Sequence, residues 1–119
     1  MELPPATGVD LSRADDAADQ ATGSARVERR QDLVRVVLAG EIDIEMKDEL
    51  FDALQEAARD GQPVEVDCGA VTFIDSTGIS GLAWLANLTS EPPCLVGVPP
   101  VMYELLQLTG MDHVFRFAT

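Results

Sequence analysis

The sequence predicts a single α/β domain with a mostly parallel, mixed β-sheet, an N-terminal hairpin and helices packed on the sheet. Apolar strand-like runs alternate with amphipathic helix-like segments, an order typical of parallel sheets. Only a polar residue pair separates the first two strand-like runs, which predicts an antiparallel hairpin. The 119 residues suffice for one hydrophobic core.

Residues 1–24 mix Pro, Gly, Ala and Asp without a sustained apolar period, and they carry five acids against one arginine. We expect a flexible, acidic, solubilising tail here, with shielding or recruitment of a partner as the alternative role. The folded domain is expected over residues 25–119.

The segments ARVERR and LVRVVLAG predict two strands joined by Gln31 and Asp32. The second is almost continuously apolar, which predicts burial on both faces. A helix is predicted within IEMKDELFDALQEAARDGQP and is stopped by Gly61 and Pro63. Its apolar face comprises Leu50, Phe51, Leu54, Ala57 and Ala58, and its solvated face carries Asp48, Glu49, Asp52 and Glu56.

The next run begins with a short strand, VEVD, followed by GAVTF, which we interpret as a turn leading to Ile74. A second helix is predicted from Ser76 to about Leu88, with Trp84 and Leu85 assigned to the core or, alternatively, to an interface. Its apolar stripe consists of Ile79, Leu82, Ala83 and Ala86.

The last third of the chain predicts a strand in PPCLVGV, a helix over VMYELLQLT and a short final strand in VFRF. Pro99 and Pro100 open the helix and Gly110 closes it.

The net charge of −13 disfavours two classes of partner, because an acidic surface repels phosphate backbones and anionic lipid heads. We therefore expect no nucleic-acid or membrane binding, and a protein partner with a basic face. No apolar run approaches about 18 residues and the N-terminus is acidic, so we expect a cytoplasmic protein.

Catalytic signals are few, so we expect no enzyme activity and no cofactor or metal. The single histidine, His113, has no partner at metal-ligand spacing, and neither phosphate-loop nor dinucleotide-binding glycine pattern is present. GISGL departs from the nucleophile-elbow spacing, which discounts Ser80. Cys68 and Cys94 are expected to be buried free thiols. A small hydrolase or nucleotide-binding enzyme is a disfavoured alternative.

The motif IDSTG, residues 74–78, places an acid and two hydroxyls where a strand-like run becomes a helix. Asp75 or Ser76 there would cap the helix by accepting hydrogen bonds from its free N–H groups. A phosphate on a hydroxyl would be tolerated at a helix N-terminus, although Asp75 would partly repel it.

Three segments in this order resemble a STAS domain, the fold shared by bacterial anti-sigma factor antagonists and the cytoplasmic tails of sulphate transporters. They are LAGEID at 38–43, VEVDCGAVTFIDSTGISGL at 64–82 and CLVGVPPVMYELLQLTGMDHVFRF at 94–117. The resemblance covers about residues 25–117. It implies an anti-sigma factor antagonist whose partner is both an anti-sigma factor and a serine kinase.

The resemblance also implies roles for individual residues. Ser76 is the serine that the partner phosphorylates; unphosphorylated, the antagonist captures the anti-sigma factor and releases the sigma factor. A phosphatase restores it, and the cycle serves a stress response. The implied partner-binding set is Asp43, Asp75, Ser76, Thr77, Gly78 and Ile79. Within it, Asp75 positions the hydroxyl, Thr77 supports the turn and Gly78 allows close backbone approach. Chemistry alone does not separate Ser76 from Thr77 as the modified residue.

An alternative role is a non-switching adaptor subunit of a stress-signalling scaffold or a lipid-transport complex. The chain ends at Thr119, just after the last predicted strand, where relatives usually add a final helix. We expect either another element or a partner to cover that face, which leaves the oligomeric state open.

Overall fold

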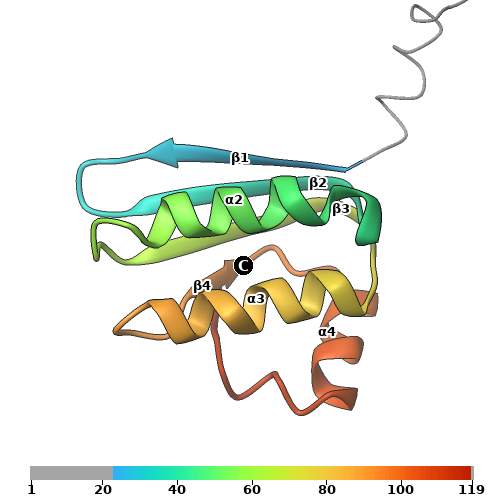
Figure 1. Ribbon diagram of the computed structural model, residues 1–119. Helices are drawn as coiled ribbons and strands as arrows, with labels where there is room; N and C mark the ends of the chain where they lie inside the picture. The colour runs from blue at the N-terminus through green and yellow to red at the C-terminus, as the bar shows by residue number, and fades with distance from the viewer. Residues whose placement is uncertain (1–22, 119) are drawn as a thin grey trace, which may run out of the picture.

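The computed structural model describes residues 23–118, which form one five-stranded mixed sheet with helices on it (Figure 1). Apart from its last two residues, the predicted acidic tail lies outside the described part of the chain. The elements follow the predicted order: β1 (Ser24–Arg29), β2 (Val34–Ile42), the 3-10 turn η1 (Ile44–Met46), α2 (Lys47–Ala58), β3 (Val64–Ile74), α3 (Ser76–Leu88), β4 (Cys94–Val96), α4 (Pro100–Leu108) and β5 (Arg116–Ala118).

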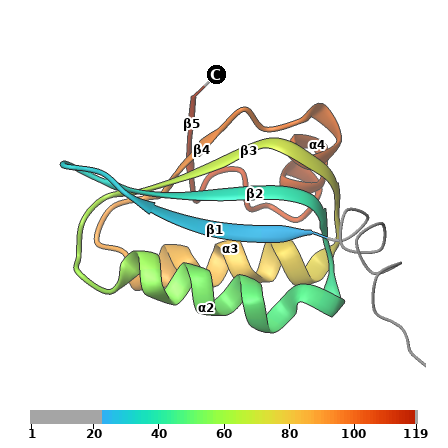
Figure 2. The same ribbon diagram turned by 90° about the horizontal axis from the view of Figure 1, so that it is seen from above.

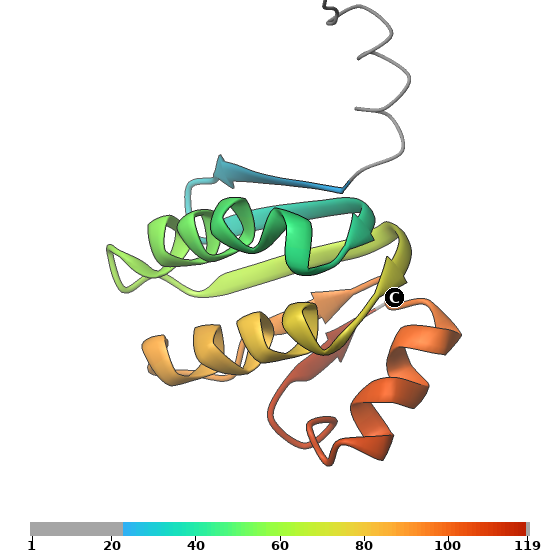
Figure 3. The same ribbon diagram turned by 45° about the vertical axis from the view of Figure 1, so that its right-hand side comes forward.

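The sheet has the strand order β1-β2-β3-β4-β5, with β1 antiparallel to β2 and all other pairs parallel. This confirms the N-terminal hairpin and the mostly parallel sheet. Helices α2 and α3 lie side by side on one face of the sheet (Figure 2), while α4 lies beyond α3, beside β4 and β5 (Figure 3). Tyr103 of α4 contacts Phe117 of β5, with ring centroids 5.2 Å apart.

The core fills the space between the sheet and these helices, and the predicted helical stripes are confirmed there. Leu50 and Leu54 of α2 and Leu82 and Leu85 of α3 are fully buried. Trp84 is half-buried, and its ring centroid lies 5.1 Å from that of Phe51 on α2. Trp84 and Leu85, for which the sequence left both a core and an interface role open, therefore pack with the core.

The prediction that β2 is buried on both faces is wrong. Val34, Val36 and Leu38 are fully buried beneath the helices, but Arg35 and Val37, which alternate with them, are partly exposed. Only one face of the strand is covered, so the strand follows the two-residue alternation of a half-buried sheet. On the other face Arg35 forms ion pairs with carboxylates of β3, Glu65 at 2.8 Å and Asp67 at 3.8 Å.

The predicted turn at GAVTF is also wrong, because β3 continues as one strand of 11 residues to Ile74. The register against β2 shifts twice, between the partners of Val37 and Ala39 and between those of Gly40 and Glu41. Each shift places an extra β3 residue opposite β2, which is a bulge. The turn-like residues are thus accommodated inside a strand.

The last two strands are shorter than predicted. β4 contains three residues and is followed by Gly97, whose φ of 68° lies in the left-handed region. β5 begins two residues later than expected, after Val114 and the buried Phe115. Pro100 opens α4 and Gly110, with φ of 75°, follows it, as predicted.

Candidate functional site

The predicted site lies where β2 and β3 end side by side. Each of these parallel strands ends in an isoleucine that an aspartate follows, and Ile42 is paired in register with Ile74. The backbone N–H of Asp75 donates to the carbonyl oxygen of Ile42 at 3.2 Å. Because the carboxyl ends of parallel strands meet at one edge of a sheet, Asp43 and Asp75 both lie just beyond that edge.

Each aspartate caps the helical turn that follows it. Asp43 Oδ1 accepts a hydrogen bond from the N–H of Glu45 at 3.1 Å, at the start of η1. Asp75 Oδ1 accepts from the N–H groups of Thr77 at 2.8 Å and Gly78 at 3.4 Å, at the start of α3. Of the two cap candidates in the sequence, Asp75 is the cap.

Ser76 is therefore the first residue of α3 rather than its cap, and it is exposed. Its hydroxyl makes no hydrogen bond with any residue in the described part of the chain. Thr77 beside it is half-buried. Of the two hydroxyls in the motif, Ser76 is the more accessible.

Gly78 and Ile79 hold the first turn of α3 against the sheet. Both are buried, Ile79 with 5% of its surface exposed. A Cβ atom on Gly78 would lie 2.5 Å from Cγ1 of Ile74 and 3.0 Å from Cγ2 of Ile42. These two residues position the exposed turn without presenting side chains at the surface.

A shallow hollow adjoins Ser76, between the first turns of α2 and α3. Its lining comprises Ile44, Lys47, Phe51, Ser76, Thr77 and Ser80. Ile44 is 65% exposed and contributes apolar surface. Ile44 and Lys47 were not among the predicted site residues, although Lys47 is the only lysine of the chain and follows LAGEID closely.

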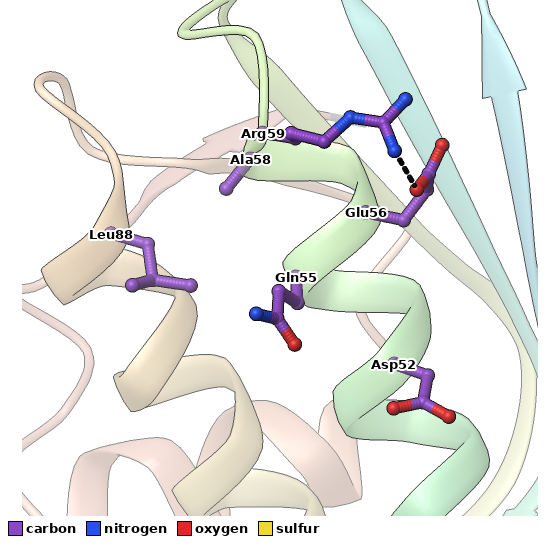
Figure 4. A pocket seen from close by; sticks show the side chains of 6 residues that line it. All are labelled: Asp52, Gln55, Glu56, Ala58, Arg59 and Leu88. Carbon is purple, nitrogen blue, oxygen red and sulfur yellow. Dashed lines mark hydrogen bonds and ion pairs between the residues drawn. The ribbon is translucent and has the colours of Figure 1, made fainter.

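A second hollow lies farther along the same two helices, near their C-terminal ends (Figure 4). Arg59 lines it and is paired with Glu56, with Nη1 and Oε1 2.8 Å apart. The remaining lining residues are Asp52, Gln55, Ala58 and Leu88. None of the predicted site residues reaches this hollow.

Other reactive side chains lie apart from the site. Cys68 is buried. Its burial and, to a smaller extent, the nearby charge of Asp67 raise the pKa of its thiol to about 12. Cys94 is free as predicted but only half-buried, because it lies on the less covered face of the sheet. The side chain of His113 is 88% exposed.

Among residues 23–118, no group of three or more His, Cys, Asp or Glu side chains could hold a metal ion. No helix within that range is both long and apolar enough to cross a membrane.

Comparisons with known proteins match this architecture. A family model described as "Mlab, STAS domain" matches residues 25–116. Curated proteins gave no match. The crystal structure of an anti-sigma factor antagonist from Mycobacterium paratuberculosis is 26% identical, with a TM-score of 0.74 over 82% of this chain and 86% of that one.

Two further similar structures are of SpoIIAA, in different states. The anti-sigma factor antagonist SpoIIAA in its unphosphorylated form is 18% identical, with a TM-score of 0.68 over 81% of this chain and 89% of that one. The Bacillus cell fate determinant SpoIIAA in its phosphorylated form is 19% identical, with a TM-score of 0.63 over 81% and 92%. At these identities the similarity concerns the fold.

Proposed function

This chain belongs to the STAS domain family, and from that membership we propose that it is an anti-sigma factor antagonist switched by phosphorylation of Ser76. In its unphosphorylated form it captures an anti-sigma factor that is also a serine kinase, which frees a sigma factor. Phosphorylation ends the capture and a phosphatase restores it. The domain over 25–119 acts in the cytoplasm as a binding module without catalysis of its own, with residues 1–24 as a solubilising tail.

The proposal depends most on the exposed hydroxyl of Ser76. Asp75 already satisfies the N–H groups at the start of α3, so the serine is not required as a cap. A kinase can therefore reach the hydroxyl without breaking an interaction that holds the helix. In the transfer, Oγ forms a bond to the γ-phosphorus of ATP, the bond to ADP breaks, and the hydroxyl proton leaves to a base of the kinase.

A phosphate on Ser76 is compatible with the fold. It would lie at the N-terminus of a 13-residue helix, where the macrodipole stabilises an anion. SpoIIAA, solved in both unphosphorylated and phosphorylated forms, shares the fold of this chain in each. We infer that the modification changes the docking surface and leaves the domain folded.

The hollow beside Ser76 has no acid in its lining, so a phosphate would change its charge. Exposed Ile44, Lys47 and the hydroxyls of Ser76 and Ser80 line this one hollow. Adding about −1.5 to −2 charges there would impose a desolvation cost on any partner packed over it. Asp43 and Asp75 would contact the partner from the sheet edge, Thr77 would support the turn, and Gly78 and Ile79 would seat it.

The test compares Ser76→Asp and Ser76→Ala in calorimetry with the serine-kinase anti-sigma factor that the wild-type protein binds. Ser76→Ala should bind like wild type and resist release by ATP, because it lacks the phosphate acceptor. Ser76→Asp should bind at least about tenfold more weakly, a loss of about 1.4 kcal/mol. Ser90→Asp, at an exposed serine after the far end of α3, is the matched charge control and should bind normally.

Phosphopeptide mapping of the protein from its own cells, with and without stress, identifies the modified residue. Occupancy at Ser76 that changes with condition supports the switch, whereas modification of Thr77 alone would move the site. Equal binding by wild type and Ser76→Asp, with no phosphate under any condition, would instead indicate the non-switching adaptor.

A further inference from the structure

Lys47 lies in the hollow that Ser76 occupies. The helices α2 and α3 start at the same end of the molecule, and their first turns lie side by side (Figures 1 and 3). From the α2 side the hollow is lined by Lys47 and Phe51, and from the α3 side by Ser76, Thr77 and Ser80. An exposed ammonium group on a flexible stem therefore shares a cavity with the exposed hydroxyl.

Lys47 differs from every described arginine in lacking an ion-pair partner. All of these arginines lie within 4.0 Å of a carboxylate: Arg26, Arg29, Arg30, Arg35, Arg59 and Arg116. Within residues 23–118, Lys47 forms no such pair, although Asp48 and Glu49 follow it directly. Its positive charge is available to a group that enters the hollow.

The position of Lys47 is not explained by the stability of its own helix. It is the first residue of α2, where the positive end of the helix dipole disfavours a cation. It is also the only lysine in a chain with net charge −13. A cation placed against the dipole and left unpaired suits an anion that is present only part of the time.

Resting on the proposed function, we propose that Lys47 is the intramolecular counter-ion of the phosphate carried by Ser76. The acids at this end of the molecule would repel the phosphate. Asp75 precedes the serine, Asp43 follows the neighbouring strand β2, and Glu45 and Asp48 flank Lys47 on η1 and α2. Pairing with Lys47 offsets their repulsion and also withdraws the ammonium from the surface presented to a partner.

The pair can be measured without a kinase or a partner. Phosphoserine is installed at position 76 during synthesis of the full chain, and the second pKa of the phosphate is followed by phosphorus NMR. Removing a nearby cation disfavours the dianion, so Lys47→Gln should raise this pKa by roughly 0.3–0.7 units, the size expected of an exposed ion pair. Lys47→Arg should restore most of the wild-type value.

Arg59→Gln is the matched control, because it removes one positive charge from the other end of the same helix, beside the hollow of Figure 4. It should leave the phosphate pKa within about 0.1 unit of wild type at 0.15 M salt, where charges are screened beyond about 8 Å.

Equal pKa values for wild type and Lys47→Gln would overturn the proposal. The readout does not depend on binding, so such a result would leave the switch at Ser76 standing. Normal binding by Ser76→Asp would overturn the switch even if the ion pair is observed.

Discussion

The division of roles between Asp75 and Ser76 matters most at the scale of single residues. Helix starts commonly use serine as a cap, which would occupy the hydroxyl with backbone N–H groups. Here the carboxylate of Asp75 accepts both hydrogen bonds, at 2.8 and 3.4 Å. The neighbouring serine is left exposed in a hydrogen-bonded turn, and a modifying enzyme can reach it there.

The cap predicts a difference between two substitutions of Asp75. Asp75→Ala removes the acceptor and should lower the free energy of unfolding by about 1 kcal/mol, while Asp75→Asn keeps a comparable cap and should change it little. Urea unfolding followed by circular dichroism measures both. Asp43→Ala is the comparison, because it caps only a three-residue turn and should cost less. If Asp75→Ala is as stable as wild type, the hydrogen bonds to Thr77 and Gly78 do not stabilise α3.

Asp75→Asn also separates capping from recognition. It removes the charge while keeping an oxygen that can accept the same two hydrogen bonds. A variant that is as stable as wild type but binds the anti-sigma factor poorly would show that the carboxylate itself contacts the partner. Normal binding would restrict Asp75 to positioning the turn.

At the scale of elements, the close seating of α3 on the strand ends depends on Gly78. The helix begins directly over Ile42 and Ile74, and a methyl group at Gly78 would meet both side chains within 3.0 Å. Branched side chains at buried strand ends have few alternative rotamers, so the helix itself would have to move. The position of Ser76 is thus set by packing two residues away.

Gly78→Ala should therefore destabilise the domain although alanine is the better helix former. Overpacking costs about 1–3 kcal/mol and the gain in helix propensity returns at most about 1 kcal/mol, so even with the full gain we expect a net loss of up to about 2 kcal/mol. Urea unfolding measures it, with Ser80→Ala, exposed in the same helix, expected within about 0.5 kcal/mol of wild type. A Gly78→Ala protein more stable than wild type would mean that α3 shifts without cost.

The elements also show what the sequence could and could not predict. Helix periodicity correctly placed α3 at Ser76–Leu88, because burial of Leu82 and Leu85 follows the 3.6-residue repeat. The errors all concern the sheet. Valine and alanine suit either face of a strand, so composition did not reveal that Val37 is partly exposed.

Features that depend on contacts between segments distant in sequence also could not be predicted from the sequence. Gly69 favours a turn locally, but parallel pairing with β2 continues β3 through this position with bulges. The hollow beside Ser76 has the same origin, since Lys47 and Ser76 meet only after α2 and α3 align on the sheet. The motif predicted the serine, whereas the neighbouring cation required the tertiary structure.

At the scale of the whole molecule, acidic side chains outnumber basic ones, which gives the net charge of −13. The described arginines are already engaged with carboxylates, so most acids within residues 23–118 lack a cation. Such a surface attracts a basic partner over long range, and salt should slow the association more than it speeds dissociation. The same charges repel one another within the domain.

This repulsion predicts that salt stabilises the protein. At 10 mM ionic strength the screening length is about 30 Å, so charges repel one another over long distances, whereas near 1 M it is about 3 Å. The melting temperature should rise by several degrees between 10 and 500 mM NaCl, since about 1 kcal/mol corresponds to roughly 4–8 °C in a domain of this size. A variant with Asp48→Asn and Asp52→Asn, both exposed on α2, should show a smaller rise because it carries less repulsion.

Salt also weakens the ion pairs of Arg29 and Arg35. A melting temperature that falls with salt would therefore mean that these pairs stabilise the fold more than the net charge destabilises it.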